Sequence, residues 1–423
     1  MKKFALCCMG LITGLLFVSN VEATTYIPAS EPTYDTTSSS KPMFFANGTS
    51  ITIAENPGVS GAIITWEGGS LAVPETTSVF GGGHEQDGVL ESTNIVMTGG
   101  TVKNVIGGGL HKSHVATTNV HIQNGKITSG VHGGGASSMS GTTCHQPWYK
   151  GDADNAINRV DNANVIIDNG SIYLLYGGGE GISYTGKANL IVNGGTHSYT
   201  TAGGSNGFTI TANMIINGGT FDVVQSVNRG SMDSAVVNIN SGNITNLYIG
   251  GETTDNSVTG KIESIATNIK GGNVTNLDIG KSNGAIIPAT SDNIAVTYVD
   301  GTVENVDLSQ YKNITEYINI TIDGNEYTVE KGKSLTSLTI LDSLKTKDGY
   351  TFKKFVNTLT NSEFAEDTPI NDSIDLATVF EKNAVVENPK TGDNIFTYIL
   401  LLIISLGGLG VIGLNYKKNS YNS

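Results

Sequence analysis

The segment "ATTNVHIQNGKITSGVHGGG" (residues 116–135) contains one copy of a pattern that recurs along the chain. Val120 and Ile122 lie two residues apart before a turn at Gly125, and Ile127 follows that turn. Alternation of this kind is typical of a strand with one buried face. Glycine allows the positive φ that a tight corner requires. The segment therefore predicts two short strands joined at a glycine corner.

The pattern repeats in register when the chain is aligned on its corner glycines. Many of the intervals are close to 25 residues, as from Gly100 to Gly125. The corner glycines are Gly69, Gly100, Gly125, Gly170, Gly195, Gly219, Gly242, Gly272 and Gly301. An asparagine stands six residues before five of them, at Asn94, Asn119, Asn164, Asn189 and Asn213. Asparagines in register can bond amide to amide between stacked strands.

One such unit cannot bury its own apolar face, so neighbouring units must stack. The sequence therefore predicts an all-β protein with a parallel, right-handed β-helix of about nine coils over residues 61–310. Residues 24–60 are expected to form an N-terminal segment and cap. A β-sandwich or jelly roll is the alternative architecture, although neither explains columns of identical residues in register.

The composition restricts the possible functions. The 423-residue chain contains 54 glycines, only 15% charged residues and a formal net charge of -14. Glycine disfavours helical bundles, and nucleic-acid binding requires clustered positive charge. We therefore expect neither a nucleic-acid partner nor a cofactor.

The pattern changes after Glu316. Gly349 to Lys353 read "GYTFK", and the segment ends "DTPINDSIDLATVF". These motifs resemble the Listeria–Bacteroides type repeat of Gram-positive surface proteins. The resemblance implies a small β-grasp-like module over residues 316–383 that acts as a stalk or spacer.

Both ends of the chain contain apolar segments with targeting features. Residues 1–23, "MKKFALCCMGLITGLLFVSNVEA", predict a signal helix with cleavage after Ala23. Residues 384–423 contain a linker, a short "NPKTG" motif, an apolar run over 395–416 that predicts a transmembrane helix, and a basic tail. The motif consists of Asn388, Pro389, Lys390, Thr391 and Gly392.

This three-part ending resembles the cell-wall sorting signal of Gram-positive surface proteins. The resemblance implies that a sortase cuts between Thr391 and Gly392 and joins Thr391 to a peptidoglycan cross-bridge. The membrane would then hold the chain only through its tail, before cleavage. A permanent transmembrane anchor is the alternative. Secretion and attachment to the cell wall are the expected location.

A long insertion interrupts the repeat between Gly125 and Gly170. It contains Cys144 and His145, and it offers Trp148 and Tyr149 for stacking on a sugar ring and Asp152 and Asp154 for hydroxyl groups or calcium. Insertions in repeat proteins commonly form the binding face. The alternative is a loop whose aromatic residues pack against the coils.

Two further groups are weaker candidates. His84, His111, His114 and His132 lie near the triple-glycine turns, with Glu180 one coil later, and stacking could gather a zinc site. Asp278 and Asp307 each follow a corner glycine by six residues and could form a catalytic carboxylate pair.

The expected function is an adhesin or display rod that binds a host or bacterial surface glycan or protein. The alternatives are a β-helix polysaccharide lyase or hydrolase and a structural component of the wall.

Overall fold

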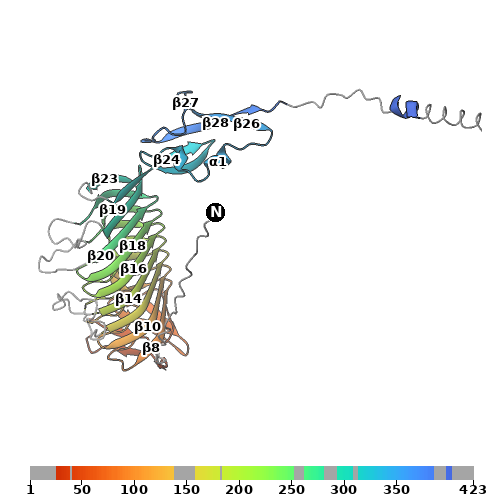
Figure 1. Ribbon diagram of the computed structural model, residues 1–423. Coiled ribbons are helices and arrows are strands. Elements are labelled where there is room, and N and C mark those ends of the chain that lie inside the picture. Colours follow the sequence, from red (N-terminus) through yellow and green to blue (C-terminus); the bar gives the residue numbers. More distant parts are fainter. Residues whose placement is uncertain are drawn as a thin grey trace, which may run out of the picture. The chain divides into compact units, whose positions relative to one another are not determined.

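The computed structural model describes residues 25–38, 41–137, 158–181, 183–251, 262–280, 293–307, 313–384 and 397–402. The chain is mostly β and divides into two compact units (Figure 1). The first unit comprises Met1–Thr321, Asn325–Ser337 and Asp367–Ile374. The second comprises Ile322–Gly324, Leu338–Glu366 and Asp375–Ser423.

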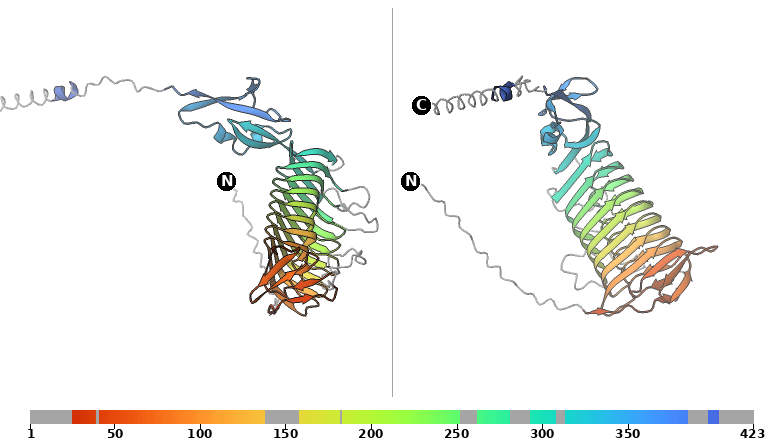
Figure 2. Two further views of the ribbon diagram at one scale, coloured as in Figure 1. Left: turned by 180° about the vertical axis from the view of Figure 1, so that it is seen from behind. Right: turned by 90° about the vertical axis from the view of Figure 1, so that its right-hand side faces the viewer.

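The first unit contains two long stacks of parallel strands, here called sheet A and sheet B (Figure 2). The strands of sheet A are β8 (Val89–Met97), β10 (Ser113–Ile122), β12 (Asn158–Ile167), β14 (Ser183–Val192), β16 (Phe208–Ile216), β18 (Ser231–Ile239), β20 (Ile262–Ile269), β22 (Ile294–Val299) and β24 (Ile314–Ile322). Those of sheet B are β9 (Thr101–Ile106), β11 (Lys126–His132), β13 (Ser171–Tyr176), β15 (Thr196–Thr201), β17 (Thr220–Gln225), β19 (Asn243–Tyr248), β21 (Asn273–Asp278) and β23 (Val303–Asp307).

The chain alternates between the two sheets, so that each coil contributes one strand to each. Within the described residues, eight coils contain both strands, from β8 and β9 to β22 and β23. Strand β24 then adds a further parallel strand to sheet A beside β22. This arrangement is a β-solenoid with parallel sheets that stack in register, as the repeat predicts.

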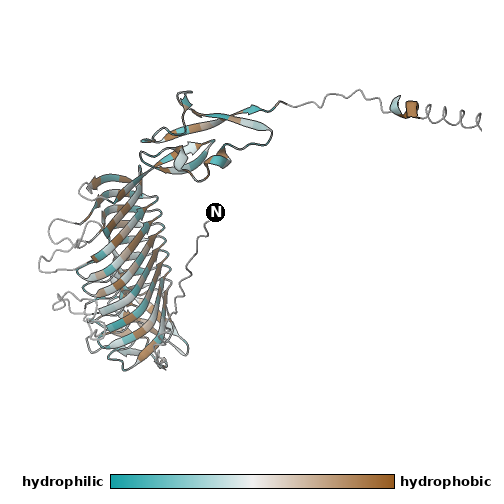
Figure 3. Ribbon diagram, in the orientation of Figure 1, coloured by the Kyte–Doolittle hydropathy of each residue, from teal (hydrophilic) through white to brown (hydrophobic). Residues whose placement is uncertain are grey.

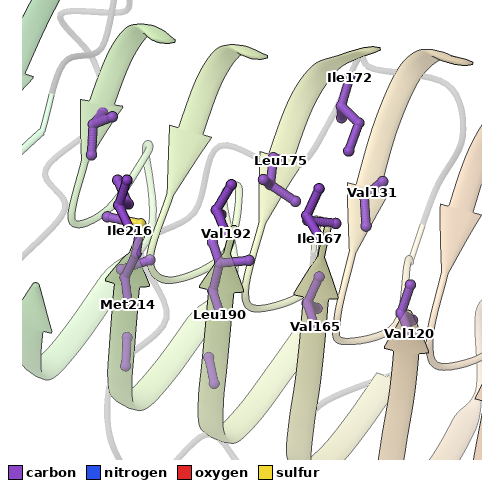
Figure 4. Packing of buried hydrophobic residues seen from close by; sticks show 14 of the residues in the cluster. Val120, Val131, Val165, Ile167, Ile172, Leu175, Leu190, Val192, Met214 and Ile216 are labelled. Carbon is purple, nitrogen blue, oxygen red and sulfur yellow. The ribbon is translucent and has the colours of Figure 1, made fainter. Parts of the chain in front are cut away.

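The apolar core lies between the two sheets. Hydropathy alternates along their strands (Figure 3). Figure 4 shows residues of neighbouring coils that meet in this core, among them Ile167 and Ile172 from the two strands of one coil. Ile122, Ile167 and Val192 occupy the same position in successive coils and are fully buried. Burying one such side chain contributes about 1.5–3 kcal/mol to stability, so the stack depends on this column.

The corner glycines meet two steric requirements. Gly125 and Gly170 have φ values of +128° and +122°, which residues with a Cβ rarely adopt. A Cβ on Gly170 would also lie 2.8 Å from the carbonyl oxygen of Gly125 in the preceding coil. Close stacking of the coils therefore requires glycine at this corner.

The predicted asparagine column forms an amide ladder. Nδ2 of Asn119 donates to Oδ1 of Asn94 at 3.0 Å, Asn164 to Asn119 at 3.1 Å, and Asn189 to Asn164 at 2.9 Å. Asn213 is in register with Asn189, as the sequence predicts. Each hydrogen bond contributes about 0.5–1.5 kcal/mol net, and together the bonds fix how the coils are paired.

The turn at Gly69 is not a coil corner, so that part of the sequence prediction is wrong. Trp66 and Gly69 face each other in an antiparallel hairpin of β5 (Ala62–Trp66) and β6 (Gly69–Val73). Apolar alternation and a glycine turn occur in hairpins as well as in coils, so the sequence pattern does not separate the two. The strands before the first coil are β1 (Tyr26–Ile27), β2 (Thr33–Asp35), β3 (Met43–Phe45), β4 (Ile51–Glu55), β5 (Ala62–Trp66), β6 (Gly69–Val73) and β7 (Ser78–Phe80).

These first strands cover the starting edges of both sheets. Strands β1 and β4 pair in parallel with β8 of sheet A. Strand β7 pairs in parallel with β9 of sheet B, and β3 pairs with β7. Covering an open edge prevents it from pairing with other chains.

After the coils, the first unit also contains β25 (Asn325–Glu330) and the short helix η3 (Leu335–Ser337). The second unit contains α1 (Leu341–Leu344), β26 (Tyr350–Asn357), β27 (Glu363–Phe364) and most of β28 (Ile374–Lys382). Strand β26 pairs antiparallel with β27 and β28, and Phe355 at its centre is fully buried.

The predicted signal helix lies outside the described residues. Of the predicted transmembrane segment, only residues 397–402 are described, and they are helical. Within the described part of the chain, no helix is both long enough and apolar enough to cross a membrane.

Candidate functional site

The two kinds of connection between the sheets differ in their regularity. Every connection from sheet A to sheet B has three residues, as in 123–125 between β10 and β11. The connections from sheet B back to sheet A vary widely, and they span residues 107–112, 133–157, 177–182, 202–207, 226–230, 249–261, 279–293 and 308–313. All the long insertions of the solenoid therefore leave from the same side of the coils.

A narrow ladder of backbone bridges runs along this side. Its members are His84, Leu110, Ala136, Glu180, Ser205 and Asn228, each bridged to the next in parallel. We call the side of the coils that carries the return connections the insertion edge, and the row of bridges follows it as far as Asn228. The residue that follows has a positive φ in several coils, for example +58° at His111 and +62° at Asn206. This left-handed bend turns the chain from the insertion edge toward the next strand of sheet A.

The predicted ligand-binding insertion departs from the insertion edge and returns beside it. The N–H of Ser137 donates to the carbonyl oxygen of Glu180 at 3.3 Å. On the return, Nδ2 of the buried Asn158 donates to the carbonyl oxygen of Ala136 at 2.5 Å. The candidate residues within the insertion lie outside the described part of the chain: Cys144, His145, Trp148, Tyr149, Asp152 and Asp154.

A buried histidine lies at the start of this insertion. The ring of His132 stacks on Tyr176 with centroids 4.9 Å apart, and Nε2 lies 3.5 Å from Oε2 of Glu180. Burial lowers the pKa of His132, although the charge of Glu180 opposes this effect. Burial also raises the pKa of Tyr176, whose hydroxyl accepts a hydrogen bond from Asn228 at 3.0 Å. His132 and Tyr176 are therefore both uncharged at neutral pH, and their stacking links two coils.

A charged cluster lies where the insertion rejoins sheet A. Oδ1 of Asp161 accepts a hydrogen bond from Nε of Arg159 at 2.8 Å, and its Oδ2 lies 3.1 Å from Nε2 of His114. Burial opposes ionisation of Asp161, but the hydrogen bonds to His114 and Arg159 outweigh it and lower the pKa of Asp161. The guanidinium of Arg159 lies 5.2 Å from the ring centroid of Tyr184 in the next coil. These contacts hold the first strand after the insertion in register with its neighbours.

The four histidines considered for zinc do not come together in one group. The rings of His84 and His111 lie 5.1 Å apart, whereas His114 contacts Asp161 and His132 contacts Glu180. In the described ranges, no group of three or more His, Cys, Asp or Glu side chains is arranged to hold a metal ion.

The two candidate carboxylates occupy equivalent positions in neighbouring coils. Asp278 of β21 is the register partner of Asp307 of β23, as their spacing from the corner glycines predicts. Asp278 lines a hollow of about 290 Å³ on sheet B, and its Oδ1 accepts the N–H of Gly280 at 3.2 Å. The other lining residues are Asn246, Tyr248, Asn276, Leu277, Asn305 and Val306.

The asparagines of this hollow are not recognisable as a site from the repeat pattern described above. Asn246, Asn276 and Asn305 each follow a corner glycine by four residues. That column carries Asn104 in the first coil and Gly130, Leu174, Tyr199 and Val223 in the coils that follow. Consecutive asparagines occupy it only in the last three described coils. A search for short columns near the end of the repeat would have found it.

No family model, curated protein or solved structure matches this chain.

Proposed function

We propose that the protein is exported and attached to the cell wall, where its solenoid displays insertions that bind a glycan or protein on a host or bacterial surface. The observation that supports this proposal is the insertion edge. The connections from sheet A to sheet B stay at three residues, while the return connections hold all the long insertions. Variable loops on one side of a regular repeat commonly form a binding surface.

The architecture lets these insertions vary without disturbing the core. Ser137 and Asn158 anchor the two ends of the insertion over 138–157 to the insertion edge. The cost of closing a loop rises only slowly with its length, whereas the stacked sheets supply the stability. We infer that the coils are right-handed, because crossover connections between parallel strands have that hand in almost all proteins.

The proposed attachment rests on the sequence motifs at the two ends. A signal peptidase would cut after Ala23, and a sortase would cut between Thr391 and Gly392 and join the chain to peptidoglycan. The apolar tail would hold the chain in the membrane only until that cut. The second unit would serve as a β-grasp-like spacer of the Listeria–Bacteroides type.

Fractionation of cells tests the attachment. The full chain, with an epitope after Ser423, is expressed in a sortase-positive Gram-positive host. We expect protein that is released by muramidase and has lost the epitope, while Thr391→Ala leaves the epitope in the membrane fraction. Wild-type protein that keeps the epitope in the membrane would instead support a permanent anchor.

Binding to cells tests the display role. Bacteria that carry the full chain are compared with bacteria that carry a variant lacking residues 138–157, at equal surface levels. We expect adhesion to at least one cell type in a panel of host and bacterial cells, and weaker adhesion by the variant. An absence of adhesion by both strains would favour a structural role in the wall.

A second candidate function is cleavage of extracellular polysaccharide. The observation that favours it is the register of Asp278 with Asp307, together with the hollow on sheet B that Asp278 lines. Two carboxylates on neighbouring strands can supply the acid and base of glycoside hydrolysis. Release of reducing ends from a polysaccharide panel, abolished by Asp278→Asn and by Asp307→Asn, would support this role.

A further inference from the structure

The middle of sheet B has an outer face with few charges. Strands β13, β15, β17, β19 and β21 contain two acidic residues, Asp222 and Asp278, and no lysine or arginine. Their exposed positions carry mainly hydroxyl, amide and phenol groups, for example Ser171, Thr196 and Asn243. This surface suits a ligand that is polar but not charged.

An aromatic patch lies on this face. Tyr173 is 52% exposed, and its ring centroid lies 6.1 Å from that of Tyr199 in the next coil, at an interplanar angle of 79°. Leu174 and Val223 are the register partners of Tyr199 on either side. Tyr173 is exposed and Tyr199 is half-buried, and both rings offer apolar faces together with hydroxyl groups that can bond to a ligand.

Two rows of amides continue along the same sheet toward β23. Nδ2 of Asn276 donates to Oδ1 of Asn246 at 3.0 Å, and Nδ2 of Asn305 donates to Oδ1 of Asn276 at 3.1 Å. In the second row, Nδ2 of Asn273 donates to Oδ1 of Asn243 at 3.0 Å. The first row borders the hollow of about 290 Å³.

The hydrogen bonds of these rows do not use the full capacity of the amides. A side-chain amide has two N–H donors and an oxygen that accepts two hydrogen bonds. The row occupies one donor and one acceptor site of Asn276. Its remaining donor and acceptor can serve a hydroxyl group of a ligand, in an orientation that the row itself fixes.

We propose that the outer face of sheet B binds a neutral glycan chain that runs across the coils. Tyr173 and Tyr199 contact the sugar rings, and Asn276 with its neighbouring amides binds the hydroxyl groups. Coils stack about 4.8 Å apart, so a glycan chain of several sugars that runs across the coils can reach both the tyrosines and the amide rows. The inference goes beyond the proposed function, because it adds a site for a neutral glycan on the sheet, separate from the ligand site of the insertions.

The surface charge decides between classes of ligand. Nucleic acids and acidic polysaccharides require basic side chains, and the five strands of this face contain neither lysine nor arginine. A neutral polymer has no charged groups, so binding to this face leaves no charge of the ligand without a partner.

The experiment uses cells that display the full chain, together with fluorescent hexasaccharides of glucose, mannose and N-acetylglucosamine and an acidic hexagalacturonate. We expect at least one neutral probe to bind and hexagalacturonate not to bind. The double variant Tyr173→Ala with Tyr199→Ala should weaken binding about tenfold or more, since two stacking contacts are lost. The double Phe variant keeps the rings and should stay within about threefold of wild type.

Matched variants control for folding and for position. Tyr26→Ala removes an exposed tyrosine of β1, away from sheet B, and should leave binding unchanged. Asn276→Ala should weaken binding at an unchanged surface level. A lack of binding by every neutral probe would overturn the inference, as would equal binding by the double Ala variant.

The outcomes also separate this inference from the proposed function. Glycan binding that survives the double Ala variant but disappears without residues 138–157 would place the site on the insertion. That result would keep the display role and reject the site on sheet B. Binding of a cell-surface protein, without any neutral glycan, would have the same consequence.

Discussion

Nδ2 of Asn164 donates to Oδ1 of Asn119 at 3.1 Å, although 45 residues separate the two in sequence. The next rung of the ladder, from Asn189 to Asn164, spans only 25 residues and is 2.9 Å long. The long insertion thus leaves the register of the coils unchanged. The solenoid can therefore accept variable segments at its insertion edge while its core stays regular.

Replacement of Asn164 by alanine should destabilise the solenoid. The variant removes the donor to Asn119 and the acceptor for Asn189, both partly buried, so we expect a loss of about 1–3 kcal/mol in the free energy of unfolding. Asn240→Ala is the control, because this exposed residue donates to Asn217 at the end of another row. It should change stability by about 0.5 kcal/mol or less. Denaturant titration measures both, and equal effects would show that the ladder is not a special source of stability.

Replacement of a corner glycine by alanine should reduce the free energy of unfolding more where atoms of the neighbouring coil lie close to the glycine. Gly170→Ala combines a φ of +122° with a contact of 2.8 Å to the carbonyl oxygen of Gly125. Gly301 has a φ of +79°, and a Cβ added there would meet no atom within 4 Å, so Gly301→Ala should cost only about 1–2 kcal/mol from backbone strain. The clash should add about 1–3 kcal/mol at Gly170. Similar unfolding midpoints for the two variants would contradict this account.

Two buried histidines should make the solenoid less stable in mild acid. Burial lowers the pKa of His132 and of His197, so the unfolded chain binds protons that the folded chain does not. Stability should therefore fall as the pH drops below the unfolded value of about 6.5. The variant His132→Phe with His197→Phe removes both groups, and phenylalanine already follows His197 in its column at Phe221. Unfolding midpoints at pH 7.5 and 5.5 should differ less in this variant than in wild type, and an unchanged difference would refute the assignment.

Deletion of residues 138–157 should leave the solenoid folded. The shortened connection, residues 133–137, has the length of the natural connection 226–230 between β17 and β18. We expect a thermal midpoint within a few degrees of wild type, because the ladder and the core are unaffected. Circular dichroism measures the midpoint. Unfolding of the variant would show that the insertion supports the coils and is not an addition to them.

Much of the solenoid can be predicted from the sequence because its signals are local and repeated. Alternating apolar residues, a corner glycine and an asparagine at a constant offset recur from coil to coil, and the structure confirms the resulting register of Asn94, Asn119, Asn164 and Asn189. The same counting predicts the register of Asp278 with Asp307. It fails at the Gly69 hairpin because the local pattern of a hairpin resembles that of a coil corner.

The side-chain contacts at the candidate sites cannot be predicted by counting residues from the corner glycines. His114 contacts Asp161, and His132 contacts Glu180, between the same two neighbouring coils. The first contact lies on sheet A, and the second lies at the end of sheet B. Their separation depends on which strand each residue belongs to and on the direction in which its side chain points.

Local sequence features are enough to specify the coil. When similar units stack, the alternating apolar residues become buried and a glycine stands at each tight corner. The surfaces that the stack presents depend on the tertiary structure. The fold places all the long insertions on one edge and brings Tyr173, Tyr199 and the amide rows onto one face, because residues about 25 apart become neighbours only when sheets A and B close around a common core.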